Sequence, residues 1–466
     1  MLQWHTKAGQ EKRTAVCWNY QAVIEGMIPS SAPASTSSTK EIAHHPKRKF
    51  EYRLEGLRGM AALVVVWFHG VSIERGLDPH FTLSGPLAYH VPGHLSVLLF
   101  FILSGYVIGI TNAVPLTGPT VRTYLKKRFV RIYPIYAVAM LLTWAVAQPY
   151  PVGTWLAHLS LTHVLLAKVI IENEPAWSLH YEVVFYLLFI PVSLWRANAW
   201  PVAGGCVLLG VVNQLLWPTN TLLTCYCFGL AFWLCGLGLS QRALPSRWAS
   251  SQFLVGMLLL LLSLHSFNIF ETLLWKVAQL AVGDRLYYHY FPGAEQLRAV
   301  ITFGDLAFLP VGALYILLFT NQDFPGRQYT LWALFGLPAA TFLYLGQHHG
   351  QLNLAPYNLS SAFYVAAVAL VAVPSARIEA VAARAMQRLV KLGGISYGLY
   401  IVHFPIMTGL RRVEAFSGTG FTYGVRFALY LLLSLLLAYY LEKLLQPQMR
   451  RLLTSQKQEL AVPRPT

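Results

Sequence analysis

Long apolar stretches recur along the chain after residue 50, separated by short polar segments that contain most of the charges. A stretch of about 20 apolar residues predicts a membrane-spanning helix, because a helix satisfies its own backbone hydrogen bonds in lipid. The pattern therefore predicts an all-α fold, a polytopic integral membrane helical bundle with roughly 10–12 transmembrane helices. The stretches cover about 57–75, 95–113, 129–147, 176–195, 200–217, 222–240, 250–268, 303–320, 331–347, 357–374, 394–411 and 424–445.

The composition and the charge distribution agree with this pattern. Of the 466 residues, 56% are hydrophobic and 12% are charged, against roughly 25% charged in a soluble domain. The net charge of +16 does not indicate nucleic-acid binding, because the basic residues cluster in alternate segments between apolar stretches. Such clusters mark the cytoplasmic side, so both termini are predicted to be cytoplasmic. The clusters contain Lys47, Arg48, Lys49, Arg53 and Arg58, then Arg122, Lys126, Lys127, Arg128 and Arg131, then Arg377, Arg384, Arg388 and Lys391, and finally Lys443, Arg450 and Arg451.

The two ends of the chain differ from the apolar region. Residues 1–50 contain a Ser/Pro/Ala-rich stretch at 29–40 followed by a basic stretch, which predicts a disordered, basic cytoplasmic tail. Residues 51–447 are the predicted transmembrane domain, and 448–466 are a second cytoplasmic tail. The longest ordered-looking excursion between apolar stretches is residues 269–302. The five cysteines show neither a disulfide framework nor zinc-ligand spacing, so we expect no metal site.

Arg58 and His69 are the most informative pair of residues, because ten uncharged residues separate them within the first apolar stretch. Ionisable side chains are costly in a membrane and often mark functional sites. Eleven residues are about three helical turns, so both side chains lie on one face, about 16 Å apart along the axis. This spacing suits a phosphate-binding cation near one surface and an acid–base group deep in the membrane. The alternative is an interfacial Arg and a helix-packing His.

Two further motifs contain candidate binding residues. In FFILSGY, Ser104 precedes Gly105, and small residues of this kind favour close helix packing. In KRFVRIYP, Arg128 and Arg131 are three residues apart, so they project from one face and could hold a phosphate together. An ordinary cytoplasmic anchor is the alternative for these two arginines.

Two more motifs place polar groups inside apolar stretches. In WSLHYEVVFY, Glu182 and Tyr186 share a helix face, and the carboxylate needs a partner such as His69, an arginine or a substrate hydroxyl. A structural ion pair between helices is the alternative for Glu182. In GGISYGLYIVH, His403 is a candidate second catalytic or positioning group, or an interfacial hydrogen-bonded His.

Taken in order, these motifs resemble the membrane-bound acyltransferase 3 family, which O-acylates glycans and some small molecules. The resemblance runs from YRLEGLRGMAALVVVWFHG to LEKLLQP, over residues about 52–447. It implies that Arg58 and His69 are the family's essential pair and that Glu182 is its fourth-helix acid. The family usually has about ten core helices, so twelve stretches imply an inserted pair within 270–347. His180-Tyr181 departs from the family's small residue pair, and His180 is expected to alter acceptor selection.

The sequence therefore predicts an O-acyltransferase of the bacterial inner (plasma) membrane. It would move an acyl group, expected to be acetyl, from acyl-CoA to a hydroxyl of a cell-surface glycan or small-molecule acceptor. The predicted catalytic residues are His69, Arg58 and Glu182, and the predicted substrate-binding residues are Arg128, Arg131, Tyr186, Ser104 and His403. Acyl-CoA is a donor substrate, and no bound cofactor or nucleic acid is expected. The alternatives are a multi-pass transporter of a polar substrate and a structural membrane protein.

Overall fold

The computed structural model describes residues 52–85, 89, 91–241, 249–286 and 300–459. These residues all belong to the larger of two units of the chain, Lys49–Thr466. They form helices joined by short loops, and the described part of the chain contains no β-strand. The predicted tail 1–50 and the centre of the 269–302 excursion lie outside the described residues.

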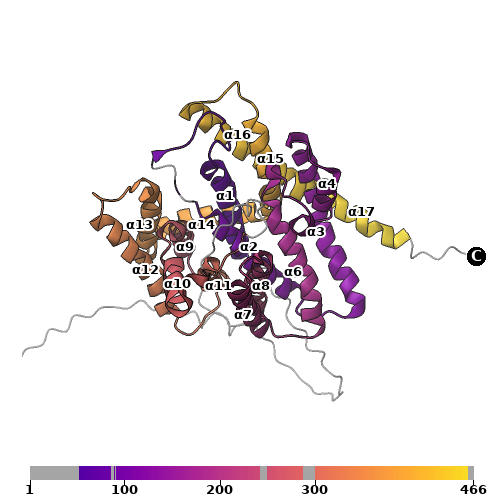
Figure 1. The fold of residues 1–466 in the computed structure, drawn as a ribbon, viewed down its shortest axis with the longest axis horizontal. Coiled ribbons are helices and arrows are strands. Elements are labelled where there is room, and N and C mark those ends of the chain that lie inside the picture. The colour runs from indigo at the N-terminus through magenta and orange to yellow at the C-terminus, as the bar shows by residue number, and fades with distance from the viewer. Residues whose placement is uncertain (1–51, 86–88, 90, 242–248, 287–299, 460–466) are drawn as a thin grey trace, which may run out of the picture. The chain divides into compact units, whose positions relative to one another are not determined.

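The helices follow the apolar stretches closely (Figure 1). The α-helices are α1 (Tyr52–Ser72), α2 (Gly93–Thr111), α3 (Gly118–Val146), α4 (Val152–Leu159), α5 (His163–Leu166), α6 (Ala176–Leu194), α7 (Ala199–Leu216), α8 (Thr221–Ser240), α9 (Ser251–Phe267), α10 (Ile269–Val282), α11 (Leu309–Phe319), α12 (Arg327–Gln347), α13 (Asn358–Ala372), α14 (Ala376–Gly393), α15 (Ser396–Arg411), α16 (Gly420–Tyr439) and α17 (Gln446–Glu459). The 3₁₀ helices are η2 (Ile171–Asn173), η3 (Gly283–Leu286), η4 (Gly304–Phe308) and η5 (Ala355–Tyr357), and η6 (Tyr440–Leu445) is a π-helical segment.

The predicted all-α membrane bundle is confirmed. Within the described residues, nine helices are long and apolar enough to span a membrane, or up to eleven if each of two bent pairs counts as one span. The bent pairs are α9 with the following α10 and η3, and α14 with α15. The segment predicted at 303–320 is a shorter apolar helix, Gly304–Phe319, so it does not reach spanning length by itself.

The start of the third spanning helix differs from the expectation. The apolar stretch begins at 129, but α3 begins at Gly118, so the basic residues expected between two helices lie within α3. A capping box explains this early start, because Thr117 and Thr120 satisfy each other's backbone N–H groups and Pro119 follows the cap. Hydropathy misses the first turns because lysine and arginine are good helix formers despite their charge.

Two other segments expected as loops are helical. The excursion after residue 268 begins with α10, and the basic segment before the eleventh apolar stretch is α14. Helix α14 meets α15 at a bend of 73°, next to Gly393 and Gly394. Apolar and basic residues alternate with helical periodicity along α14, which favours a helix at the membrane surface over a buried span.

Helices α1 and α2 lie at the centre of the described bundle. In Figure 1, α9, α10, α12 and α13 lie on one side of α1 and α2, and α3, α4 and α6 lie on the other. Helix α2 packs along α8, while α1 packs along α14 and α15. This arrangement brings α1, α2, α3, α6 and α15 around one polar cavity, which is described below.

The crossing of α2 and α8 depends on two glycines that face each other's backbone. A Cβ atom on Gly105 would lie 1.9 Å from the carbonyl oxygen of Trp233, and one on Gly236 would lie 1.9 Å from that of Ile102. Neither position has room for a side chain, so the two backbones are in contact. Gly105 follows Ser104 directly, and this crossing therefore fixes how Ser104 enters the cavity.

We expect Gly105→Ala to destabilise the folded protein by roughly 1–3 kcal/mol, because the added methyl group must push α2 away from α8. Thermal unfolding of the purified protein in detergent would measure this as a lower Tm. Gly204→Ala on α7 is the matched control, since a Cβ there meets no atom within 4 Å. Equal Tm values for the two variants would contradict the close crossing.

Candidate active site

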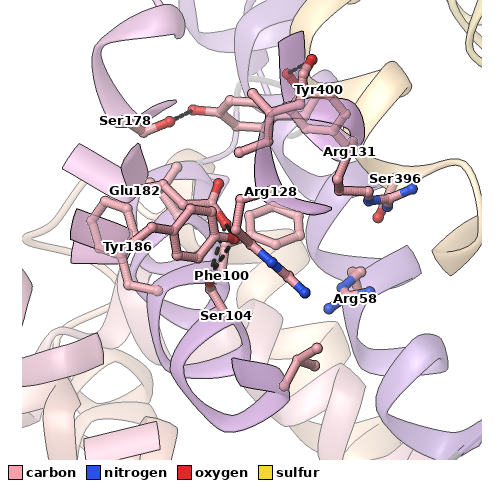
Figure 2. Close-up of a pocket in the computed structure, with 15 residues that line it drawn as sticks. Arg58, Phe100, Ser104, Arg128, Arg131, Ser178, Glu182, Tyr186, Ser396 and Tyr400 are labelled. Atoms are coloured by element: carbon pink, nitrogen blue, oxygen red, sulfur yellow. Dashed lines mark hydrogen bonds between the residues drawn. The ribbon is translucent and has the colours of Figure 1, made fainter. Parts of the chain in front are cut away.

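A polar cavity of about 140 Å³ lies among α1, α2, α3, α6 and α15. Figure 2 shows the arginines, the acidic side chain and the hydroxyl groups that surround it. Six of the eight predicted site residues line this cavity, and His69 and His403 do not. The lining residues are Arg58, Val97, Phe100, Phe101, Ser104, Val107, Arg128, Arg131, Ile132, Ser178, Glu182, Tyr186, Ser396, Tyr397 and Tyr400.

Glu182 is held by two hydroxyl groups on the cavity wall (Figure 2). Its Oε1 accepts hydrogen bonds from the Ser104 hydroxyl at 2.9 Å and from the Tyr186 hydroxyl at 2.5 Å. Tyr186 reaches Glu182 because the two are four residues apart on α6. The Trp233 indole donates to Ser104 at 3.3 Å, which orients this hydroxyl from α8. The partners of Glu182 are thus hydroxyl groups, and neither His69 nor any arginine that the structure describes forms an ion pair with it.

The three arginines that line the cavity are not equivalent. Arg58 forms an ion pair with Glu55 at 2.8 Å, one turn earlier on α1. Arg131 forms an ion pair with Glu442 at 2.8 Å and also donates to Gln446 at 2.9 Å. Arg128 forms no ion pair within the described part of the chain.

The guanidinium group of Arg128 faces aromatic rings. It lies 5.9 Å from the ring centre of Tyr124 and 5.8 Å from that of Tyr186. Its Nε is buried and has no hydrogen-bond partner among the described residues. A buried donor without a partner is unfavourable, so an anion that accepted from Arg128 would satisfy it. Arg128 is therefore the cavity arginine that is most ready to bind an added anion.

His69 and His403 form a buried pair beyond the cavity wall. Nδ1 of His69 lies 3.0 Å from Nε2 of His403, and the ring of His403 lies 6.1 Å from that of Tyr400, which lines the cavity. Each Nδ1 also faces a carbonyl oxygen one turn earlier, Val65 for His69 and Leu399 for His403. A carbonyl can only accept, so neutral rings carry their protons on Nδ1. Nε2 of His69 then keeps its lone pair, and no described residue hydrogen-bonds to it.

His180 is not part of this cavity. It is buried, with Nδ1 at 2.5 Å from the carbonyl oxygen of Leu161 and Nε2 hydrogen-bonded to Tyr226. It packs against His163, which stacks on His158 in the short helices α4 and α5. Burial lowers the pKa of His158 to about 4, so this stack is neutral near pH 7. The expected role of His180 in acceptor selection has no support from its position.

Neither of the two carboxylates that pair with cavity arginines was among the predicted site residues. Glu55 was recognisable, because it precedes Arg58 by three residues, a spacing that places oppositely charged groups together on a helix. Glu442 lies in the π-helical segment η6, at the end of the last spanning helix. Its Oε1 accepts from the backbone N–H of Gly398 at 3.0 Å, and the ion pair with Arg131 joins residues that are 311 positions apart. Such a pairing is visible only after folding.

Comparison with known proteins decides the family. A family model described as an acyltransferase domain matches residues 51–292, about half of the chain. The chain belongs to the acyltransferase 3 family. The matched region includes Arg58, His69, Ser104, Arg128, Arg131, Glu182 and Tyr186, and it ends before the motif that contains His403.

Two curated relatives agree with this assignment. Acyltransferase MdmB of Streptomyces mycarofaciens is 32% identical over 150 residues, which cover 29% of this chain and 37% of the relative. Protein 2 in the picA locus of Rhizobium radiobacter is 33% identical over 172 residues, which cover 31% of this chain and 82% of the relative. No solved structure matches the chain significantly. The acyltransferase 3 domain, together with the spanning helices, identifies an integral membrane protein.

Removing the cation from the Arg131–Glu442 pair should destabilise the protein. Arg131→Met leaves Glu442, whose side chain is 1% exposed, without its ion-pair partner, and we expect a loss of roughly 2 kcal/mol. The loss should be smaller than for a fully buried pair, because the Arg131 side chain is 40% exposed. The double variant Arg131→Met with Glu442→Gln should regain most of the Tm.

Arg122→Met is the matched control for this measurement. Arg122 is exposed on the same helix and forms no ion pair within the described residues. A Tm unchanged in Arg131→Met would show that solvent screens the pair completely.

Proposed function

We propose that this acyltransferase 3 protein transfers an acyl group, most simply acetyl, from cytoplasmic acyl-CoA to a hydroxyl of a cell-surface glycan or a similar acceptor. The observation that carries the proposal is the cavity, in which three arginines meet a hydroxyl-bound carboxylate. Coenzyme A has several phosphate groups, and arginine binds phosphate through paired N–H donors. No observation favours the transporter alternative, because the matched domain is an acyltransferase domain.

The donor's phosphates would bind at the arginine end of the cavity. Arg128 would bind first, because its guanidinium lacks a carboxylate partner and its Nε lacks any partner among the described residues. Arg58 and Arg131 would exchange part of their contact with Glu55 and Glu442 for phosphate oxygens. This end of α1 and α3 is the predicted cytoplasmic side, where acyl-CoA is available. The cytoplasmic termini and the bacterial inner membrane are parts of the same proposal.

The acyl group would react at the histidine pair. Arg58 and His69 lie about 16 Å apart along α1, a separation that the long pantetheine arm of coenzyme A can bridge. Nε2 of His69 would take the proton from the acceptor hydroxyl while the hydroxyl oxygen attacks the thioester carbonyl. The C–S bond then breaks, and the coenzyme A thiolate leaves and takes up the proton. His403 would hold His69 in this orientation through the 3.0 Å contact.

Glu182 and Tyr186 would complete the site between the two ends. The Tyr186 hydroxyl donates to Glu182 in the free protein, and a developing oxyanion would compete for such a donor. The apolar wall formed by Phe100 and Phe101 would exclude water from the thioester. The role of Ser104 in this proposal is to fix the Glu182 carboxylate, rather than to contact the acyl group.

Arg128→Ala should raise the apparent KM for acetyl-CoA about tenfold or more, because a charge-assisted phosphate contact is lost. The effect should shrink with acetyl-pantetheine, a thioester donor without the nucleotide phosphates. Steady-state kinetics with membranes that contain the full chain would measure both values. Arg122→Ala removes the same charge from an exposed position on α3 and serves as the control. Equal KM increases for the two donors would contradict phosphate binding by Arg128.

His69→Ala should lower the rate of acyl transfer roughly 10²- to 10⁴-fold, the range typical for loss of a general base. The variant should keep its affinity for coenzyme A, since the donor site lies at the other end of α1. Its Tm should fall by only a few degrees, because one buried ring is lost. His349→Ala, at an exposed histidine after α12, is the control. A well-folded His69→Ala variant with activity within about threefold of wild type would exclude His69 as the base.

A further inference from the structure

A histidine–carboxylate pair lies at the start of α2, and neither of its members was among the predicted site residues. Nε2 of His94 lies 3.0 Å from Oδ1 of Asp305, which belongs to η4. The other oxygen of Asp305 accepts from the backbone N–H of Thr302 at 2.7 Å and from its hydroxyl at 3.2 Å. These bonds fix the carboxylate, which in turn orients the imidazole. The His94 side chain remains 29% exposed, and no described residue hydrogen-bonds to its Nδ1.

The position of His94 links this pair to the cavity. His94, Val97, Phe101 and Ser104 follow one another at three- and four-residue spacing, so they lie along one face of α2. The last three line the cavity, and His94 extends their row by one turn. The ring of Trp177 stacks on His94 with centres 6.3 Å apart and also contacts Phe101 edge-on. Ser178, the next residue along α6, lines the cavity.

The pair also lies at the same level of the bundle as the predicted base. Gly93 precedes His94, and a Cβ on Gly93 would lie 2.3 Å from the ring of Phe68. Phe68 precedes His69 and packs edge-on against its ring at 5.0 Å. The start of α2 and the end of α1 are therefore in contact. A molecule bound at His94 would lie close to the His69–His403 pair. Ser104, by contrast, is about 15 Å further along α2.

The surroundings of His94 are acidic, whereas the other end of the cavity contains the arginines. Asp305 contacts His94 directly, and Glu271 lies within electrostatic range of it. Glu271 is hydrogen-bonded to the indole of Trp275 at 3.2 Å. An anion would be repelled here, while hydroxyl groups would find hydrogen-bond partners beside aromatic rings.

We propose that His94, held by Asp305 and stacked on Trp177, binds the hydroxyl acceptor, and that this end of the site selects a neutral or cationic polyhydroxylated acceptor unit. The proposal rests on the acyl transfer proposed above and adds the place where the acceptor binds. The Nε2–H of His94 donates a hydrogen bond to Asp305, which leaves Nδ1 to hydrogen-bond a hydroxyl. The donor and the acceptor then approach the histidine pair from ends of opposite charge, so neither competes for the other's binding groups.

Two variants test this proposal in membranes that contain the full chain and the cell's own acceptor. His94→Phe keeps a ring on Trp177 but loses the hydrogen bond to Asp305 and the proposed one to the acceptor hydroxyl. Asp305→Asn keeps the size of the side chain but removes its charge. With radiolabelled acetyl-CoA, we expect label incorporation into the acceptor to fall at least tenfold in His94→Phe and severalfold in Asp305→Asn. The KM for acetyl-CoA should stay within about twofold of the wild-type value. The Tm should stay within a few degrees of wild type. Asp323→Asn, at an exposed site, is the control.

The possible outcomes separate the two proposals. Wild-type incorporation by a well-folded His94→Phe variant would overturn acceptor binding by His94 and leave the acyl transfer proposal intact. A parallel fall of incorporation, donor affinity and Tm in both variants would show that the pair only joins α2 to η4, which also overturns it. If the acceptor unit that receives the label proved to be anionic, the proposed preference for a neutral or cationic acceptor would be contradicted. Membranes with the wild-type chain that incorporate no label would instead contradict acyl transfer itself.

Discussion

The cost of placing charge in a membrane-embedded bundle organises the interior of this protein. Each buried or half-buried ionisable group must find a partner inside the protein, because lipid offers none. Arg58 pairs with Glu55, Arg131 pairs with Glu442, and Glu182 accepts from two hydroxyl groups. Arg128 is set apart from this pattern, because aromatic rings surround it and its Nε lacks a partner within the described residues. The polar cavity forms where Arg58, Arg128, Arg131 and Glu182 project into the same region between the helices.

The pairing also separates the site into regions with different chemistry. The arginines lie toward the ends of α1 and α3 that are rich in basic residues. His69 lies about three turns further along α1, in contact with His403 of α15. Helices that pack closely keep these regions apart. The contact of Gly105 and Gly236 with the facing backbones fixes α2 against α8, so Ser104 and Glu182 remain between the two regions. A substrate must therefore extend along the bundle to contact both ends.

The π-helical segment Tyr440–Leu445 shows how a local irregularity serves this arrangement. An extra residue per turn rotates the side chains that follow it, and such segments occur often at functional sites. Here it places Glu442 where one oxygen reaches the Gly398 N–H and the other reaches Arg131. Helices α3, α15 and η6 are thereby joined through one carboxylate. Gln446 adds to this junction by donating to the backbone oxygen of Arg131 at 2.7 Å.

Hydropathy and motif order by themselves determined the membrane bundle, the family and six of the residues that line the cavity. Spanning helices are recognisable because lipid requires about 20 apolar residues in a row, and the motif residues lie a few positions apart on single helices. Helix starts within basic segments, as in α3, were not recognisable from hydropathy, because a cap and not apolarity decides them. Only the tertiary structure paired Arg131 with Glu442, His69 with His403 and His94 with Asp305. These contacts join residues more than 200 positions apart, and their geometry follows from how the helices cross.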